Sequence, residues 1–137
     1  MEKNITFKFT EKNFSNPNQM QALTLAYIGD AIYEIIIRTI VVGEGNRQVN
    51  QLHKKSSNLA KAGTQAEMVL KLQPFLEEEE EQIYKRGRNA KSYTAAKNAD
   101  IIDYRNATGF EALMGYLYMQ GKTERMFELV KKGMELL

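Results

Sequence analysis

A chain of 137 residues, 43% of them hydrophobic, is long enough for one buried core and short for two, so we expect a single domain over residues 1–137. The lack of cysteine excludes disulfides and thiolate metal sites, and the single histidine, His53, disfavours zinc catalysis and a Ser-His-Asp triad. A net charge of +2 does not by itself indicate a nucleic-acid partner, and the polar N-terminus lacks a signal peptide's apolar segment, which predicts a cytoplasmic protein.

The first predicted helix begins near Asn16 and ends before Gly43, and it is strongly apolar. Asp30, Glu34 and Arg38 lie near its centre, and each would cost roughly 2.5 to 3.5 kcal/mol in a bilayer, so we expect a core helix and no membrane partner. These three residues are spaced one turn apart and form a polar stripe. The stripe either faces water, with Glu34 and Arg38 paired, or carries a function through Asp30.

Helical spacing of apolar residues continues along the chain and predicts an all-α fold. A second helical region is expected over residues 48–73, interrupted at Gly63. Further helices are predicted over residues 75–88, 108–119 and 123–137. The acidic run Glu77–Glu81 should open its helix, with basic residues closing it, because this order complements the helix macrodipole. Residues 87–100 have a turn-like composition and should form an exposed connector.

Glu111 is a lone acid in the apolar run ATGFEALMGYLYMQG, as Asp30 is in its own helix. Small residues adjoin both acids, Gly29 beside Asp30 and Gly115 one turn from Glu111, so the two helices can approach with both carboxylates turned to one space. Two such carboxylates repel each other unless a proton or cation compensates, and Mg²⁺ is a hard cation that takes oxygen ligands. The alternative is a capping box in which Thr108 is the N-cap and Glu111 the N3 residue.

The stretch LAYIGDAIYE, residues 25–34, resembles the signature helix of the ribonuclease III family, which usually reads Leu-Glu-Phe-Leu-Gly-Asp-Ala. FEALMGYLYMQG, residues 110–121, resembles the family's second acidic motif. The resemblance is clearest over residues 17–121, the catalytic domain, and leaves no separate double-stranded-RNA-binding domain. It implies a helical, homodimeric bundle that cleaves both strands of an RNA duplex with Mg²⁺, which Mn²⁺ can replace. In the family branch without the second domain, the implied substrate is precursor ribosomal RNA.

Compared position by position, Asp30 matches the aspartate of the signature and Glu111 the glutamate of the second motif, which implies that both are catalytic metal ligands. Two further acids of the family pattern are absent, because Ala26 and Thr108 stand at their positions. The sequence therefore leaves open whether one or two ions bind. It also leaves open whether Glu34, one turn beyond Asp30, takes part through a bound water.

The apolar, glycine-containing first helix also predicts a homodimer, because one small core does not cover its whole surface. Tyr27 occupies the position at which the family joins its two signature helices, so Tyr27 and Gly29 are the expected interface residues. An ordinary core aromatic is the alternative for Tyr27.

Without a second domain, affinity for RNA must come from the catalytic surface. Two basic segments combine cations with amides and hydroxyls that suit phosphates and 2′-hydroxyl groups. Their candidate RNA-binding residues are His53, Lys54, Lys55 and Ser56 in QLHKKSSN, and Arg86, Arg88, Asn89 and Lys91 in KRGRNAKS. Either segment is alternatively a solvated face.

The favoured function is a Mg²⁺-dependent endoribonuclease in which a metal-activated water attacks a backbone phosphate of double-stranded RNA. The alternative from another class is a non-catalytic helical RNA-binding or scaffolding module, in which Ala26 and Thr108 mark lost chemistry. A metal-dependent nucleotide phosphohydrolase is disfavoured, because a single histidine cannot supply the expected His-Asp pairs.

Overall fold

The computed structural model describes residues 16–90 and 100–137 of the chain. The described residues form six α-helices and two short 3₁₀ segments and contain no strand, which confirms the all-α prediction. The elements are η2 Pro17–Gln19, α1 Ala22–Glu44, α2 Val49–Ala60, α3 Ala62–Leu72, η3 Gln73–Phe75, α4 Glu78–Asn89, α5 Ile101–Met119 and α6 Thr123–Leu136. Within these residues, no helix is both long enough and apolar enough to span a bilayer.

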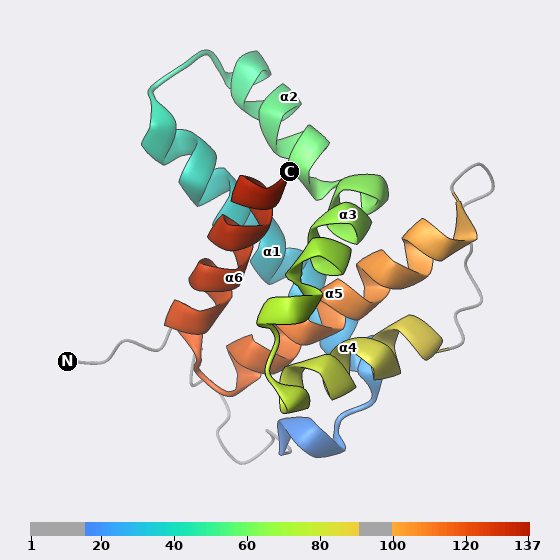
Figure 1. Ribbon diagram of the computed structural model, residues 1–137. Helices are drawn as coiled ribbons and strands as arrows, with labels where there is room; N and C mark the ends of the chain where they lie inside the picture. Colours follow the sequence, from blue (N-terminus) through green and yellow to red (C-terminus); the bar gives the residue numbers. More distant parts are fainter. Residues whose placement is uncertain (1–15, 91–99) are drawn as a thin grey trace.

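Helix α5 is the centre of the bundle, with α1 crossing behind it and α4 lying alongside it in Figure 1. It also contacts α3 and α6. Because α5 has neighbours on all sides, its residues from Ala112 to Tyr118 are all buried, as the uniformly apolar sequence requires. The ring of Tyr33 from α1 meets that of Phe110 edge-on, with centroids 5.4 Å apart.

The first helix starts later and ends later than the sequence indicates. Asn16 does act as a cap, since its side chain accepts a hydrogen bond from the Asn18 amide at 3.0 Å, but the helix it caps is the short segment η2. The backbone then extends at Met20, and α1 begins at Ala22. At the other end α1 runs through Gly43, because an exposed glycine weakens a helix without stopping it.

The predicted helical region 48–73 is divided at Lys61, whose extended backbone ends α2 and begins α3. The interruption is therefore not at Gly63, which lies in the first turn of α3. The prediction that acids open α4 and bases close it is confirmed. Glu77 and Glu80 form a capping box at its start, and Arg86 lies in its last turn.

The connector expected over residues 87–100 is shorter than predicted, because Gly87–Asn89 still belong to α4. Helix α5 starts at Ile101, with Asp100 as its N-cap accepting from the Ile102 amide at 2.8 Å. Residues 91–99 lie outside the described part of the chain.

An ion pair between the partly exposed Arg125 and the buried Glu80 joins α6 to α4. The Nη2 of Arg125 lies 2.8 Å from Oε1 of Glu80 and its Nε 2.8 Å from Oε2, while Nη2 also donates to the carbonyl of Phe75 at 2.8 Å. Burial acts to raise the pKa of Glu80, but the hydrogen bonds and charge of Arg125 outweigh it and hold the pKa below its usual value. Because the folded pKa is lowered, the stability from Glu80 is present above its unfolded pKa and is lost as the pH falls through the folded value.

Replacing Arg125 with methionine should lower the free energy of unfolding at pH 7 by about 3 kcal/mol, because it leaves the Glu80 carboxylate buried without its partner. The difference in free energy of unfolding between parent and variant should be smaller at acid pH, because Glu80 is then protonated in both proteins. Urea unfolding of parent and variant at pH 7 and at acid pH measures this difference. A deficit that is the same at both pH values would show that the loss comes from packing and not from the charge.

Candidate active site

Two glycines bring the backbones of α1 and α5 into direct contact. A Cβ added at Gly29 would lie 1.7 Å from the carbonyl oxygen of Glu111, and one added at Gly115 would lie 1.9 Å from the carbonyl oxygen of Leu25. No side chain larger than hydrogen fits at either position. The crossing places the helix turn that carries Asp30 against the turn that carries Glu111.

At this crossing the carboxyl groups of Asp30 and Glu111 lie close enough to interact electrostatically. Asp30 is exposed, whereas Glu111 is half-buried. Burial first, and then the hydrogen bond and charge of Asp30, raise the pKa of Glu111 to about 8. At neutral pH the metal-free pair therefore retains a proton, and a cation that replaces this proton would relieve the same repulsion.

The donor set of this pair suits one hard divalent cation. It offers carboxylate oxygens, one from an exposed and one from a half-buried side chain, so an ion can enter from solvent and keep part of its hydration shell. Within residues 16–90 and 100–137, no group of three or more acids, histidines or cysteines is placed to hold a metal ion. Ala26 and Thr108 stand where the family pattern has two further acids, so the acidic group at the crossing consists of two carboxylates.

The capping-box alternative for Glu111 is wrong, because α5 begins at Ile101 and not at Thr108. Thr108 lies inside the helix, where its hydroxyl donates to the carbonyl of Tyr104 at 3.0 Å. Glu111 therefore has no capping role, and its position in the helix is explained by its contacts across the α1–α5 crossing.

The two acids of the polar stripe on α1 have different partners. Glu34 accepts a hydrogen bond from Arg38 Nε at 3.3 Å, an i,i+4 pair of the kind that contributes about 0.3 to 0.5 kcal/mol. Asp30 instead faces Glu111. Glu34 is thus engaged with Arg38, and the acid that meets α5 is Asp30.

One residue of the site, Gln65, could not be identified from the sequence. It lies in the first turn of α3, is 3% exposed, and its Nε2 donates to Oε2 of Glu111 at 3.5 Å. The same nitrogen donates to the carbonyl of Ala60 at 2.7 Å. A glutamine in an apolar helix carries no local signal for a contact that is 46 positions away in the chain.

The first candidate RNA-binding segment lies on helix α2. His53 and Lys54 are exposed, and Lys55 forms an ion pair with Glu44. Ser56 is buried and its hydroxyl donates to the carbonyl of Leu52 at 2.9 Å, so the expectation that it contacts RNA is corrected.

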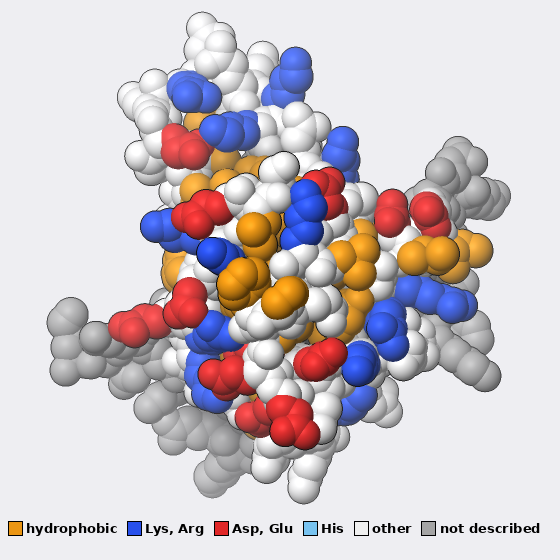
Figure 2. All heavy atoms as spheres, viewed as in Figure 1, with side chains coloured by type: hydrophobic (Ala, Val, Ile, Leu, Met, Phe, Trp, Pro, Cys, Tyr) orange, Lys and Arg blue, Asp and Glu red, His pale blue; other side chains and the backbone are white. Residues whose placement is uncertain are grey.

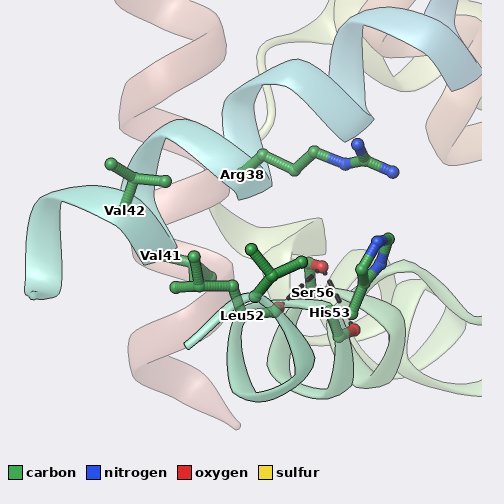
Figure 3. A pocket seen from close by; sticks show the side chains of 7 residues that line it. Arg38, Val41, Val42, Leu52, His53 and Ser56 are labelled. Atoms are coloured by element: carbon green, nitrogen blue, oxygen red, sulfur yellow. Dashed lines mark hydrogen bonds between the residues drawn. The ribbon is translucent and has the colours of Figure 1, made fainter. Parts of the chain in front are cut away.

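Arg38 from α1 and His53 from α2 extend to the same side of the pocket shown in Figure 3. The rest of the pocket is lined mainly by aliphatic side chains, among them Val41, Val42 and Leu52. The acidic pair is not part of this lining, so the one histidine of the chain belongs to a different place on the surface.

The second candidate segment lies largely at the end of α4, and its cations already have partners. Arg86 donates to the carbonyl of Met20 at 2.7 Å and so holds the segment before α1. Arg88 lies 5.6 Å from the ring centroid of Tyr84, and its Nε donates to Oδ1 of the exposed Asn89 at 3.1 Å. Lys91 lies outside the described residues. On the face shown in Figure 2, acids intersperse the cations, and no single basic patch dominates the view.

The two candidate interface residues behave differently. Tyr27 is 83% exposed, which excludes the alternative of an ordinary core aromatic. Gly29 is buried against α5 of its own chain, so its close packing is intramolecular. Of the two candidates, only Tyr27 is exposed enough to contact a second subunit, and the interface stays a prediction.

Fold and site together define a small all-helical domain that presents an acidic pair, suited to a hard cation, at a close helix crossing. The model of the Ribonuclease III domain matches residues 23–122, and the chain belongs to this family. It is 49% identical to Mini-ribonuclease 3 of Brevibacillus brevis, over 89% of this chain and 91% of the relative. It is 51% identical to Mini-ribonuclease 3 of Enterococcus faecalis, over 82% and 86%. A crystal structure of a Fusobacterium nucleatum protein superposes with a TM-score of 0.76 at 27% identity, over 86% of this chain and 94% of that one.

Proposed function

We propose that this chain is a Mg²⁺-dependent endoribonuclease that cleaves double-stranded RNA, with Asp30 and Glu111 as the ligands of the ion. Membership of the Ribonuclease III domain family and the similarity to proteins named Mini-ribonuclease 3 support the reaction class. The observation that carries the assignment of residues is the close α1–α5 crossing, where Gly29 packs against the Glu111 backbone and the adjoining Asp30 interacts with the Glu111 carboxyl group. Mn²⁺, another hard divalent ion, is expected to replace Mg²⁺.

The protein's own contribution is to hold two carboxylates at a fixed separation. Glu111 is half-buried on the central helix, so its side chain is positioned by packing, while Asp30 is exposed and accessible to an ion and a substrate from solvent. When bound, Mg²⁺ supplies an activated water and neutralises negative charge that builds on the phosphate. No histidine base is required, which agrees with the position of His53 in the α1–α2 pocket.

The function is tested by incubating the protein with long double-stranded RNA in Mg²⁺, with EDTA, single-stranded RNA and double-stranded DNA as controls. We expect discrete RNA fragments from the duplex in Mg²⁺ or Mn²⁺ and none in EDTA. Stable binding of the duplex without cleavage in either ion would favour the alternative, a non-catalytic RNA-binding module. Precursor ribosomal RNA is the proposed natural substrate, and a labelled precursor duplex competing against an unrelated duplex tests that preference.

The proposed enzyme is a homodimer joined through α1. Leu23, Tyr27, Ile35 and Val42 are large apolar side chains of this helix that remain exposed. Tyr27 lies one turn after Leu23, so these two side chains share the side of the helix that carries Asp30, and Ile35 extends the exposed apolar surface two turns beyond Tyr27. An exposed apolar stripe of this kind is typical of a protein interface, and pairing it with a second copy would place two acidic pairs on one duplex.

Light scattering should give twice the 15.7 kDa chain mass for the parent at micromolar concentration. Tyr27→Glu should give a monomer, because it places a charge in the proposed interface. Leu70→Glu is the matched control, since Leu70 is an exposed leucine on α3 and its replacement should leave the dimer mass unchanged. A parent that scatters as a monomer would refute the dimer.

A further inference from the structure

Gln65 is a buried polar side chain whose hydrogen-bonding capacity is only partly used. It is 3% exposed, and its Nε2 donates to the carbonyl of Ala60 at 2.7 Å and to Oε2 of Glu111 at 3.5 Å. Its Oε1 is buried and has no hydrogen-bond partner among residues 16–90 and 100–137. Buried acceptors are nearly always paired, so an unpaired oxygen beside the acidic pair requires an explanation.

The orientation of the Gln65 amide is fixed by the corner between α2 and α3. Ala60 is the last residue of α2, and the chain leaves the helix at Lys61, so the Ala60 carbonyl has no following amide of its own helix to accept from. Rotating the Gln65 amide by half a turn would place Oε1 against this carbonyl oxygen, two acceptors facing each other. The amide nitrogen must therefore face Ala60 and Glu111, which leaves the oxygen as the unpaired atom.

We propose that Gln65 is a positioning residue for the divalent cation: its Nε2 holds the Glu111 carboxylate in the orientation that binds the ion. This inference rests on the proposed function, because it takes Asp30 and Glu111 as the ligands. Partners of this kind behind metal ligands set ligand orientation and ion affinity.

A neutral amide suits this position better than a third acid or an apolar side chain. It donates to Glu111 without adding negative charge to a pair that already repels itself. It also ties the Glu111 side chain to the α2–α3 corner, 46 positions away from it in sequence. In a site where Ala26 and Thr108 provide no carboxylate, the amide supplies polar contacts that those positions cannot.

The test compares two substitutions of Gln65 with a matched control in the same corner. Gln65→Met keeps the length of the side chain and removes both donor and acceptor, whereas Gln65→Glu keeps oxygens and adds charge. The control is Thr64→Val, because Thr64 donates to the Asn58 carbonyl at 2.7 Å and stabilises the corner without contacting Glu111. Mg²⁺ and Mn²⁺ affinities are measured by calorimetry and by the rise in melting temperature on adding the ion.

We expect Gln65→Met to weaken ion affinity by about 10- to 100-fold and to reduce the ion-induced rise in melting temperature. The Mg²⁺ concentration for half-maximal cleavage should increase by the same factor, while the KM for duplex RNA at saturating Mg²⁺ stays at the parent value. Gln65→Glu should increase the ion-induced rise in melting temperature, because the ion neutralises the repulsion among three carboxylates. Thr64→Val should keep the parent's ion affinity even where its metal-free melting temperature falls.

Parent-like ion affinity in both Gln65 variants would overturn the inference and leave the proposed function intact. If Gln65→Met does not fold, Gln65→Glu decides, because an unchanged thermal shift in that variant contradicts the position of Gln65 beside the ion. A parent protein that neither binds the ion nor cleaves duplex RNA would overturn the proposed function, and this inference with it.

Discussion

Glu111→Gln is expected to reduce the cleavage of double-stranded RNA by about 10³-fold or more while the fold is retained. Glutamine keeps the size of the side chain and removes the negative charge that would bind the ion. The melting temperature should stay near or above that of the parent, because the pKa of Glu111 is raised to about 8 and the metal-free protein already carries this group largely neutral at pH 7. Cleavage and melting are measured on the same preparations.

Asp30→Asn should lower the cleavage rate as Glu111→Gln does. The double variant should cleave scarcely more slowly than either single variant, as expected for residues that act as one unit. Glu67→Gln is the matched control, because Glu67 is an exposed acid on α3 that pairs with Lys71 at 3.0 Å. It should cleave as the parent does. Near-parental cleavage by Glu111→Gln would remove Glu111 from the active site.

Gly29→Ala should be the most damaging single substitution for stability. The added Cβ would lie 1.7 Å from the Glu111 carbonyl oxygen, and neither backbone can yield without separating α1 from α5. We expect a loss of about 3 kcal/mol or more in the free energy of unfolding, at the upper end of overpacking effects. Any folded variant should also lose cleavage, since the displaced helices no longer hold Asp30 beside Glu111.

Gly43→Ala in the same helix is the matched control for this substitution. A Cβ at Gly43 meets nothing within 4 Å, so alanine should stabilise the helix by about 0.5 to 1 kcal/mol through its higher helix propensity. Urea unfolding followed by circular dichroism measures both variants. Equal stability of Gly29→Ala and Gly43→Ala would contradict the close crossing of α1 and α5.

The acidic pair was predictable because its signals are local. Asp30 and Glu111 each interrupt an apolar helical run, and each has a glycine within one turn, so the close approach of the two helices could be inferred. The start of α5 was not predictable in the same way. Thr108 fits a cap, but its hydroxyl bonds within the helix, and Asp100 caps the helix instead.

The contacts that sequence reasoning missed are those made between distant segments. Gln65 contacts Glu111 only because α3 packs on α5. Arg86 donates its hydrogen bonds to carbonyl groups of the segment before α1. Ser56 was misplaced for a simpler reason, since a helix over QLHKKSSN turns this hydroxyl inward to bond with the Leu52 carbonyl. Composition indicates which side chains can bind RNA, whereas the packing of the helices decides which of them are free to do so.

The most direct measurement of the central claim is a calorimetric titration of Mg²⁺ into the parent, Glu111→Gln and the Glu67→Gln control, with no RNA present. If Asp30 and Glu111 hold the ion, the parent and the control will show the same saturable binding, and Glu111→Gln will show none at the same concentrations. Equal Mg²⁺ affinity in the parent and in Glu111→Gln would contradict the claim, because it would place the ion away from the α1–α5 crossing.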